Sequence, residues 1–139
     1  YDSAEEHSNV NNRILVFGSN DNLAYLSNSP SVYIDGTFSV CPSIFFQLYL
    51  FVGFVNGLYL PLAYALLPNK TRDTYTELFR ALCHQFRELG LTIRIDRISL
   101  DFELSAIMAV EEVFSWVSFI QIAHRQNEYN TRKLMWSEI

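Results

Sequence analysis

Short hydrophobic runs separated by polar breaks predict a strand, a helix and a second strand in the first part of the chain. The run Arg13–Phe17 predicts the first strand, and Ser19–Asn20 offers caps for a short helix over Asp21–Ser27. Ser31–Asp35 predicts a second strand that ends in an acid, and Gly36 after it predicts a turn.

A long uncharged stretch follows, over residues 44–67, and its length alone would suit a membrane-spanning helix. The pair Asn56-Gly57 in its centre favours a hairpin instead, because both central positions of a type I′ turn need a positive φ. A glycine and a proline flank this pair, among aromatic and β-branched residues. We therefore predict a buried β-hairpin with strands Phe45–Val55 and Leu58–Leu67, preceded by a short loop closed by Cys41-Pro42.

The rest of the chain alternates between helical and extended patterns. Apolar residues at steps of three and four, followed by Gly90, predict a helix over Asp73–Leu89. A strand over Arg97–Leu100 leads directly into Asp101. The remaining predicted elements are a helix over Glu103–Phe114, a strand over Val117–Ile122 and a helix over Ala123–Glu138. This order predicts an α/β fold with a mixed sheet and helices on its faces.

The composition fits a packed domain with an acidic surface. The chain has 139 residues, of which 50% are hydrophobic and 15% aromatic, as expected for one domain or part of one. Ten Lys and Arg against 15 Asp and Glu give a net charge of -5. Because an acidic chain is a poor general binder of phosphate backbones, a nucleic-acid substrate would require metal ions or another domain to supply positive charge.

Cysteine and histidine usage argues against a disulfide framework and a zinc site. The two cysteines, Cys41 and Cys83, form no Cys-x-x-Cys pair, which fits a reducing compartment. The three histidines, His7, His84 and His124, are far apart and show no zinc-site spacing.

The two ends of the chain indicate an incomplete protein. It starts with Tyr1 rather than Met, has no signal-peptide pattern and ends at Ile139 without a stop signal. We therefore expect a fragment or a broken gene copy. It divides into a polar segment, 1–12, expected to be frayed, and a partial domain over 13–139.

Two of the predicted strands end in the same pattern. Val32–Asp35 and Ile98–Asp101 both read apolar, any, apolar, Asp, so each Asp lies on the face opposite the two apolar residues. If the strands are parallel neighbours, both carboxylates meet at one edge of the sheet, where open α/β sheets bind ligands. Adjacent carboxylates repel each other unless a cation lies between them, and Mg²⁺ or Mn²⁺ is the expected cation.

A structural role competes with this metal site. An Asp at a strand end often caps a helix or forms a turn, and Asp101 directly precedes a predicted helix. Spacing alone favours the structural role over the metal site.

Three blocks of sequence resemble the transposase domain of Mutator-like elements. They are Asp35-Gly-Thr-Phe38, Pro61–Lys70 (PLAYALLPNK) and Asp101-Phe-Glu103. Further agreement comes from Pro42, Phe46–Tyr49, Tyr75, Phe79 and Ala106. The resemblance extends from about Arg13 to about His124, with the family's order and spacing of blocks. Any one block is weak, whereas the three together are specific.

The resemblance implies a fold and a chemistry. The expected fold is an α/β, ribonuclease H-like mixed sheet with helices on both faces, truncated at the C-terminus. The family uses a D, D, E triad and two Mg²⁺ or Mn²⁺ ions to cut DNA at transposon ends and join a 3′-hydroxyl to target DNA. Asp35 and Asp101 match the two aspartates and would be the catalytic metal ligands. Also implied are transposon-end and target DNA as partners, a homo-oligomer of the full-length protein, a nuclear location reached from the cytoplasm, and no membrane.

The C-terminal end departs from the family's pattern. His124 matches the His of a Cys-x-x-His signature, but Gln121 stands at the Cys position, Ala123 replaces the Phe that usually precedes the His, and Phe114-Ser115 replaces a common Phe-Pro. The family's final Glu lies further downstream, and the chain stops before it. With two of three acids, this piece is expected to be inactive alone.

Other residues near the pair receive weaker assignments. Glu103 is expected to support the second Asp or the helix start, where the dipole favours an acid. For His124, a role in positioning substrate or binding metal and a structural role are evenly balanced. Glu128 could be the final acid, although a solvated helix charge is favoured, and Cys41 has no visible partner.

A last group comprises candidate substrate contacts. Five basic residues are the best candidates for phosphate contact, although a solvated surface role is favoured for each: Lys70, Arg72, Arg125, Arg132 and Lys133. Tyr33 and Phe38 are expected to line the core or the cleft.

Two other function classes stay open beside the transposase fragment. The chain can belong to a domesticated, non-catalytic protein that binds DNA or protein partners, and stabilisation by Mn²⁺ would separate this class from an intact metal site. A membrane hairpin protein is the third and most distant class, and partitioning into the soluble fraction would exclude it.

Overall fold

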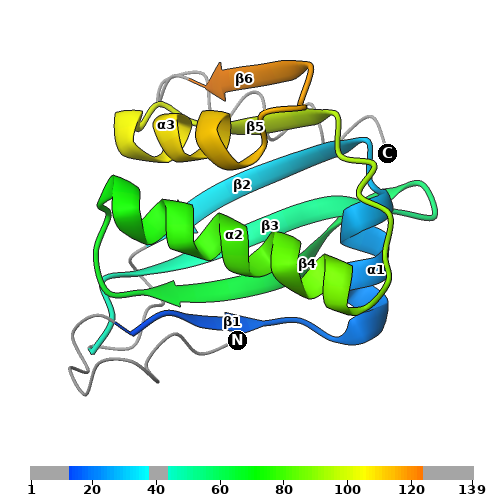
Figure 1. Cartoon of the computed structure of the whole chain (residues 1–139), viewed down its shortest axis with the longest axis horizontal. Coiled ribbons are helices and arrows are strands. Elements are labelled where there is room, and N and C mark those ends of the chain that lie inside the picture. The colour runs from blue at the N-terminus through cyan, green and yellow to red at the C-terminus, as the bar shows by residue number, and fades with distance from the viewer. Residues whose placement is uncertain (1–12, 38–43, 124–139) are drawn as a thin grey trace.

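The computed structural model describes residues 13–37 and 44–123. They form a six-stranded mixed sheet and three helices, which confirms the predicted α/β class (Figure 1). The strands are β1 (Leu15–Phe17), β2 (Ser31–Thr37), β3 (Gln47–Val55), β4 (Leu58–Leu67), β5 (Arg97–Asp101) and β6 (Phe119–Ala123). The helices are α1 (Asn20–Asn28), α2 (Arg72–Glu88) and α3 (Leu104–Val113).

The sheet joins an antiparallel half to a parallel half, in the strand order β1-β4-β3-β2-β5-β6. β1, β4, β3 and β2 pair with their neighbours in antiparallel fashion, whereas β5 is parallel to both β2 and β6. β2 is therefore the strand at which the two halves meet.

The uncharged stretch forms the predicted hairpin of β3 and β4. Asn56 and Gly57 have φ values of 49° and 87°, the two positive values that a type I′ turn requires. The register shifts after Phe51, so that Leu62 is an extra residue in β4 next to Pro61, a position where a strand tolerates a residue without N–H. Within the described ranges, no helix is long and apolar enough to cross a membrane.

Side-chain caps define where the first two helices begin. The hydroxyl of Ser19 accepts a hydrogen bond from the Asn22 N–H at 3.1 Å at the start of α1. Thr71 caps α2 in the same way through the Thr74 N–H at 3.3 Å. α2 ends before Gly90, whose φ of 68° is the left-handed conformation expected of a C′ glycine.

All three described helices pack on one face of the sheet, in a single hydrophobic core. The ring of Phe79 in α2 lies 6.2 Å from that of Phe51 in β3 and 5.6 Å from that of Phe114 at the end of α3. Leu26 of α1 contacts the same face at Gly53. The predicted fold has helices on both faces of the sheet. Within the part of the chain that the structure describes, the helices cover one face.

Two predicted boundaries are corrected. β2 continues through Gly36, predicted to be a turn, because Gly36 and Thr37 still pair with Tyr49 and Leu48 of β3. Ala123, predicted to begin a helix, is the last residue of β6. The rest of that predicted helix, 124–138, and the Cys41-Pro42 loop lie outside the described residues.

The hairpin turn generates a stability prediction. An added Cβ at Gly57 meets no atom within 4 Å, so Gly57→Ala acts only through the positive φ and should lower the free energy of unfolding by about 1–2 kcal/mol. Gly57→Asn should lose less, because Asn tolerates this conformation. Equilibrium urea unfolding measures both, and equal losses would contradict the type I′ assignment.

Candidate functional site

The parallel register of β2 and β5 brings Asp35 and Asp101 together. Ile34 pairs with Leu100, so the next position in each strand is the aspartate. Because paired residues of parallel neighbours project from the same face, both aspartates lie on one face at the carboxyl ends of adjacent strands. We call this position the aspartate edge. A cation site shared by the two aspartates requires this arrangement.

The aspartates face away from the described helices. Ile34 pairs with Phe51, whose ring packs on α2, whereas Asp35 pairs with Leu50 on the alternate face. Both aspartates are half-buried, and the Oδ1 atom of Asp101 is buried. The N-cap position of α3 belongs to Glu103 rather than Asp101, contrary to the capping role considered above.

The buried hydroxyl of Tyr49 interacts electrostatically with the carboxylates at this edge. Burial raises the pKa of Tyr49 well above its ordinary value, and electrostatic interactions with Tyr75, Glu103, Asp101 and Asp35 raise it further, in that order. Three carboxylates therefore act on one buried phenol.

Glu103 connects the second aspartate to the core. Its backbone N–H donates to the carbonyl of Asp101 at 2.8 Å, and its side chain makes no capping hydrogen bond to α3. Instead, both carboxylate oxygens accept from the hydroxyl of Tyr75, each at 2.8 Å. The backbone of Glu103 thus contacts the strand end that carries Asp101, and the supporting role expected of this residue stays a prediction.

A buried polar chain of Gln47, Tyr75 and Glu103 was missed by sequence analysis. Gln47 donates from Nε2 to the Tyr75 oxygen at 2.8 Å, and these two residues are 2% and 0% exposed. Burial, the largest cause, and the hydrogen bond to Glu103 raise the pKa of Tyr75, while the bond from Gln47 lowers it. One signal was available in the sequence: an amide within a buried apolar strand needs a hydrogen-bonding partner.

The structure describes two of the five residues that were predicted to contact phosphate. Lys70 is exposed, with its Nζ 5.8 Å from the ring centroid of Phe46. Arg72 is exposed and lies 3.8 Å from a carboxylate oxygen of Glu112. Tyr33 is buried, as expected for a core or cleft-lining residue. Outside the described residues lie Phe38, Cys41, His124, Arg125, Glu128, Arg132 and Lys133.

The described residues offer two carboxylates at the edge rather than a complete set of ligands. Within 13–37 and 44–123, no group of three or more His, Cys, Asp and Glu side chains is arranged to hold a metal ion. Asp35 and Asp101 are nevertheless hard oxygen donors of the type that Mg²⁺ and Mn²⁺ prefer. The pair therefore fits a divalent cation held partly by protein and partly by water or substrate.

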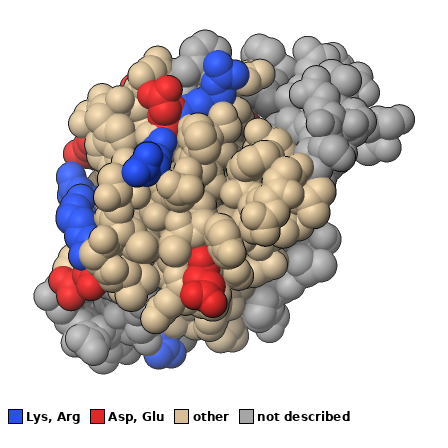
Figure 2. Space-filling view, turned by 90° about the vertical axis from the view of Figure 1, so that its right-hand side faces the viewer, with Lys and Arg blue, Asp and Glu red and all other residues tan. Residues whose placement is uncertain are grey.

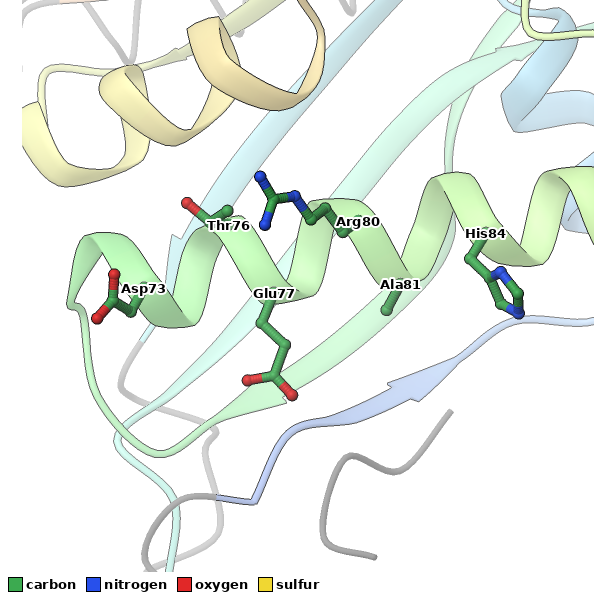
Figure 3. Close-up of a pocket in the computed structure, with 6 residues that line it drawn as sticks. All are labelled: Asp73, Thr76, Glu77, Arg80, Ala81 and His84. Carbon is green, nitrogen blue, oxygen red and sulfur yellow. The ribbon is translucent and has the colours of Figure 1, made fainter. Parts of the chain in front are cut away.

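A shallow hollow along α2 is a second candidate site (Figure 3). Its lining residues are Asp73, Thr76, Glu77, Arg80, Ala81 and His84. Arg80 and Thr76 point toward α3, where they bind Glu112 at 3.4 and 3.3 Å, and the other four point away from it. Since all six lining side chains come from α2 and spread in two directions from it, they do not converge on one point in the hollow.

Among the described residues, charged side chains form no continuous basic surface at the end of the molecule that carries α1. Figure 2 shows Lys and Arg at separate places there, interspersed with Asp, Glu and uncharged residues. A phosphate backbone would therefore find no continuous electrostatic footprint on this end.

Similarity to known proteins does not choose among these assignments. No protein-family model matches the chain, and no curated protein matches it either. The aspartate edge and the resemblance of its motifs are therefore the main indications of function.

Cys83 generates a pH prediction. Burial, only partly opposed by Arg87, raises the pKa of its thiol from 9.0 to about 11, which lowers the thiolate fraction about 100-fold below pH 9. In a Cys41→Ser variant, the native chain at pH 8.5 should react with iodoacetamide far more slowly than the urea-unfolded chain. Because only the unfolded thiol ionises between pH 9 and 11, stability should fall as the pH rises through that window. Equal alkylation rates would contradict this burial.

Proposed function

We propose that the chain is part of a transposase catalytic domain of the Mutator-like type, with a ribonuclease H-like fold. Its chemistry is metal-dependent cleavage of DNA phosphodiester bonds and strand transfer. The strongest support is the register in which Ile34 pairs with Leu100, because it carries Asp35 and Asp101 to one edge and one face. These are the aspartates that the resemblance assigns as metal ligands.

The roles of the described residues follow from this geometry. Asp35 and Asp101 would hold Mg²⁺ or Mn²⁺, and the bound ions would stabilise both the attacking and the leaving oxygen of a phosphodiester displacement. On the helix side of the sheet, the aspartate edge is covered by the core and by Tyr49, which is only 4% exposed. DNA would therefore approach from the opposite face of the sheet.

Positive charge near the edge supports DNA as the substrate. Leu67 pairs with Gln47 and Leu48 pairs with Thr37, so the segment after β4 leaves the sheet at the end where β2 finishes. Lys70 and Arg72 lie on that segment and are exposed. Lys70 is a candidate for phosphate contact beside the metal ions, whereas Arg72 begins α2 on the helix face and lies 3.8 Å from a carboxylate oxygen of Glu112.

A non-catalytic, domesticated DNA- or protein-binding module is the second candidate. The engagement of Glu103 with Tyr75 favours it, because this carboxylate is turned toward the core rather than added to the aspartate pair. Under this alternative, the aspartate edge is a relict without affinity for metal.

Metal titration separates the two candidates. An intact site should be stabilised by Mn²⁺, by about 2.7 kcal/mol at a free concentration 100 times the Kd, and the melting temperature should rise accordingly. Asp35→Asn and Asp101→Asn should each abolish most of this rise, whereas Asp21→Asn, on the exposed first turn of α1, should retain it. A melting temperature unaffected by Mn²⁺ would favour the relict site.

Catalysis provides a separate test. Because Asp35 and Asp101 match two of the three acids that the resemblance requires, we expect that the chain alone does not cleave transposon-end DNA in the presence of Mn²⁺. Cleavage is measured on labelled DNA by gel electrophoresis. Robust cutting that Asp35→Ala abolishes would contradict the expected inactivity and would identify the catalytic site at the same time.

A further inference from the structure

The hydroxyl of Tyr75 joins two strand ends that are far apart in the sequence. We propose that Tyr75 is a positioning residue, which fixes the separation of the strand ends that carry Asp35 and Asp101. The effect on metal binding rests on the proposed function, whereas the effect on the strand ends does not.

One end of the polar chain lies against the residue after Asp35. A Cβ added at Gly36 would lie 2.6 Å from Oε1 of Gln47, so the amide of Gln47 packs directly on the Gly36 backbone. Gln47 is buried, and its Nε2 is committed to Tyr75. A shift of the β2 end would therefore disturb the amide and its hydrogen bond.

The other end of the chain holds the residues after Asp101. Glu103 accepts from Tyr75 with both carboxylate oxygens, and its backbone N–H donates to the Asp101 carbonyl at 2.8 Å. The turn between β5 and α3 is thus held from the helix side. The aspartates project from the opposite face, so this contact constrains their backbone without occupying the space between them.

The direction of the hydrogen bonds makes the Tyr75 proton essential to this link. Gln47 donates to the Tyr75 oxygen, and the single hydroxyl proton is then available for Glu103. Both bonds are inaccessible to bulk water on the Tyr75 side, because Tyr75 is fully buried. Removing the hydroxyl would leave a buried amide donor and a carboxylate without this partner.

The ring of Tyr75 has a separable packing role. It lies 5.4 Å from the ring of Tyr49 and 6.4 Å from that of Phe79, centroid to centroid. Phenylalanine would fill the same volume and retain these contacts. Tyr75→Phe therefore removes the link and leaves the aromatic cluster in place.

The experiment compares Tyr75→Phe with Leu82→Val, which reduces packing at another buried position of α2. Mn²⁺ affinity is measured by isothermal titration calorimetry on the full chain, and backbone amide exchange is measured by NMR without metal. Tyr75→Phe should weaken Mn²⁺ binding about tenfold, as expected for a group that orients metal ligands, and accelerate exchange of the Glu103 amide about tenfold. Leu82→Val should leave the Mn²⁺ affinity unchanged. It should also leave the exchange rate of the Glu103 amide unchanged relative to that of the Leu100 amide.

A conservative pair tests the same link from the carboxylate. Glu103→Gln retains an acceptor for the Tyr75 hydroxyl and should preserve slow exchange of the residue-103 amide, whereas Glu103→Ala should behave like Tyr75→Phe. Unchanged exchange at residue 103 in both Tyr75→Phe and Glu103→Ala would overturn the positioning role. If the unmodified chain binds no Mn²⁺, the proposed function fails, and the exchange rates alone then decide whether Tyr75 positions the strand ends.

Discussion

The parallel pairing of β2 with β5 is the interaction on which the candidate site depends. Side chains alternate between faces along a strand, so a one-residue shift would send one aspartate to the opposite side of the sheet. The register is set where the two strands begin, because the N–H groups of Asp96 and Arg97 both donate to the Pro30 carbonyl at 2.9 Å. The N–H of Arg94 also donates to the carbonyl of Ser27 at 2.7 Å. A junction at one end of the strands therefore determines which acids meet at the other end.

The two faces of the sheet have different tasks. The helix side supplies stability through a continuous core of aromatic and aliphatic side chains, to which α1, α2 and α3 all contribute. The opposite face presents the two acids of the aspartate edge. The polar chain through Tyr75 links the two faces, because it is embedded in the core and its ends lie next to each aspartate. Buried polar groups of this kind restrict the backbone to one arrangement only when every member has a partner.

The overall charge of the chain opposes DNA binding, whereas the charge at the aspartate edge would change when metal is bound. The net charge of -5 opposes general binding to phosphate backbones, and the described residues at the end that carries α1 form no continuous basic surface. Under the proposed function, however, bound cations would neutralise the acids at the aspartate edge, and Lys70 follows the strand β4 that ends beside them. Affinity for DNA would then depend on bound metal rather than on the charge of the chain.

The sequence by itself determined the local elements and the candidate acids. Asn56-Gly57 specified a hairpin because few residues adopt consecutive positive φ values, and the apolar spacing of α2 specified a helix with one buried face. Gly36 was misassigned to a turn, since its pairing with Tyr49 depends on a neighbouring strand that local sequence does not reveal. Only the tertiary structure decided that β2 and β5 are parallel neighbours in register, and that Gln47, Tyr75 and Glu103 meet. Such contacts join residues 28 positions apart, and their geometry follows from how the sheet and helices pack rather than from any local preference.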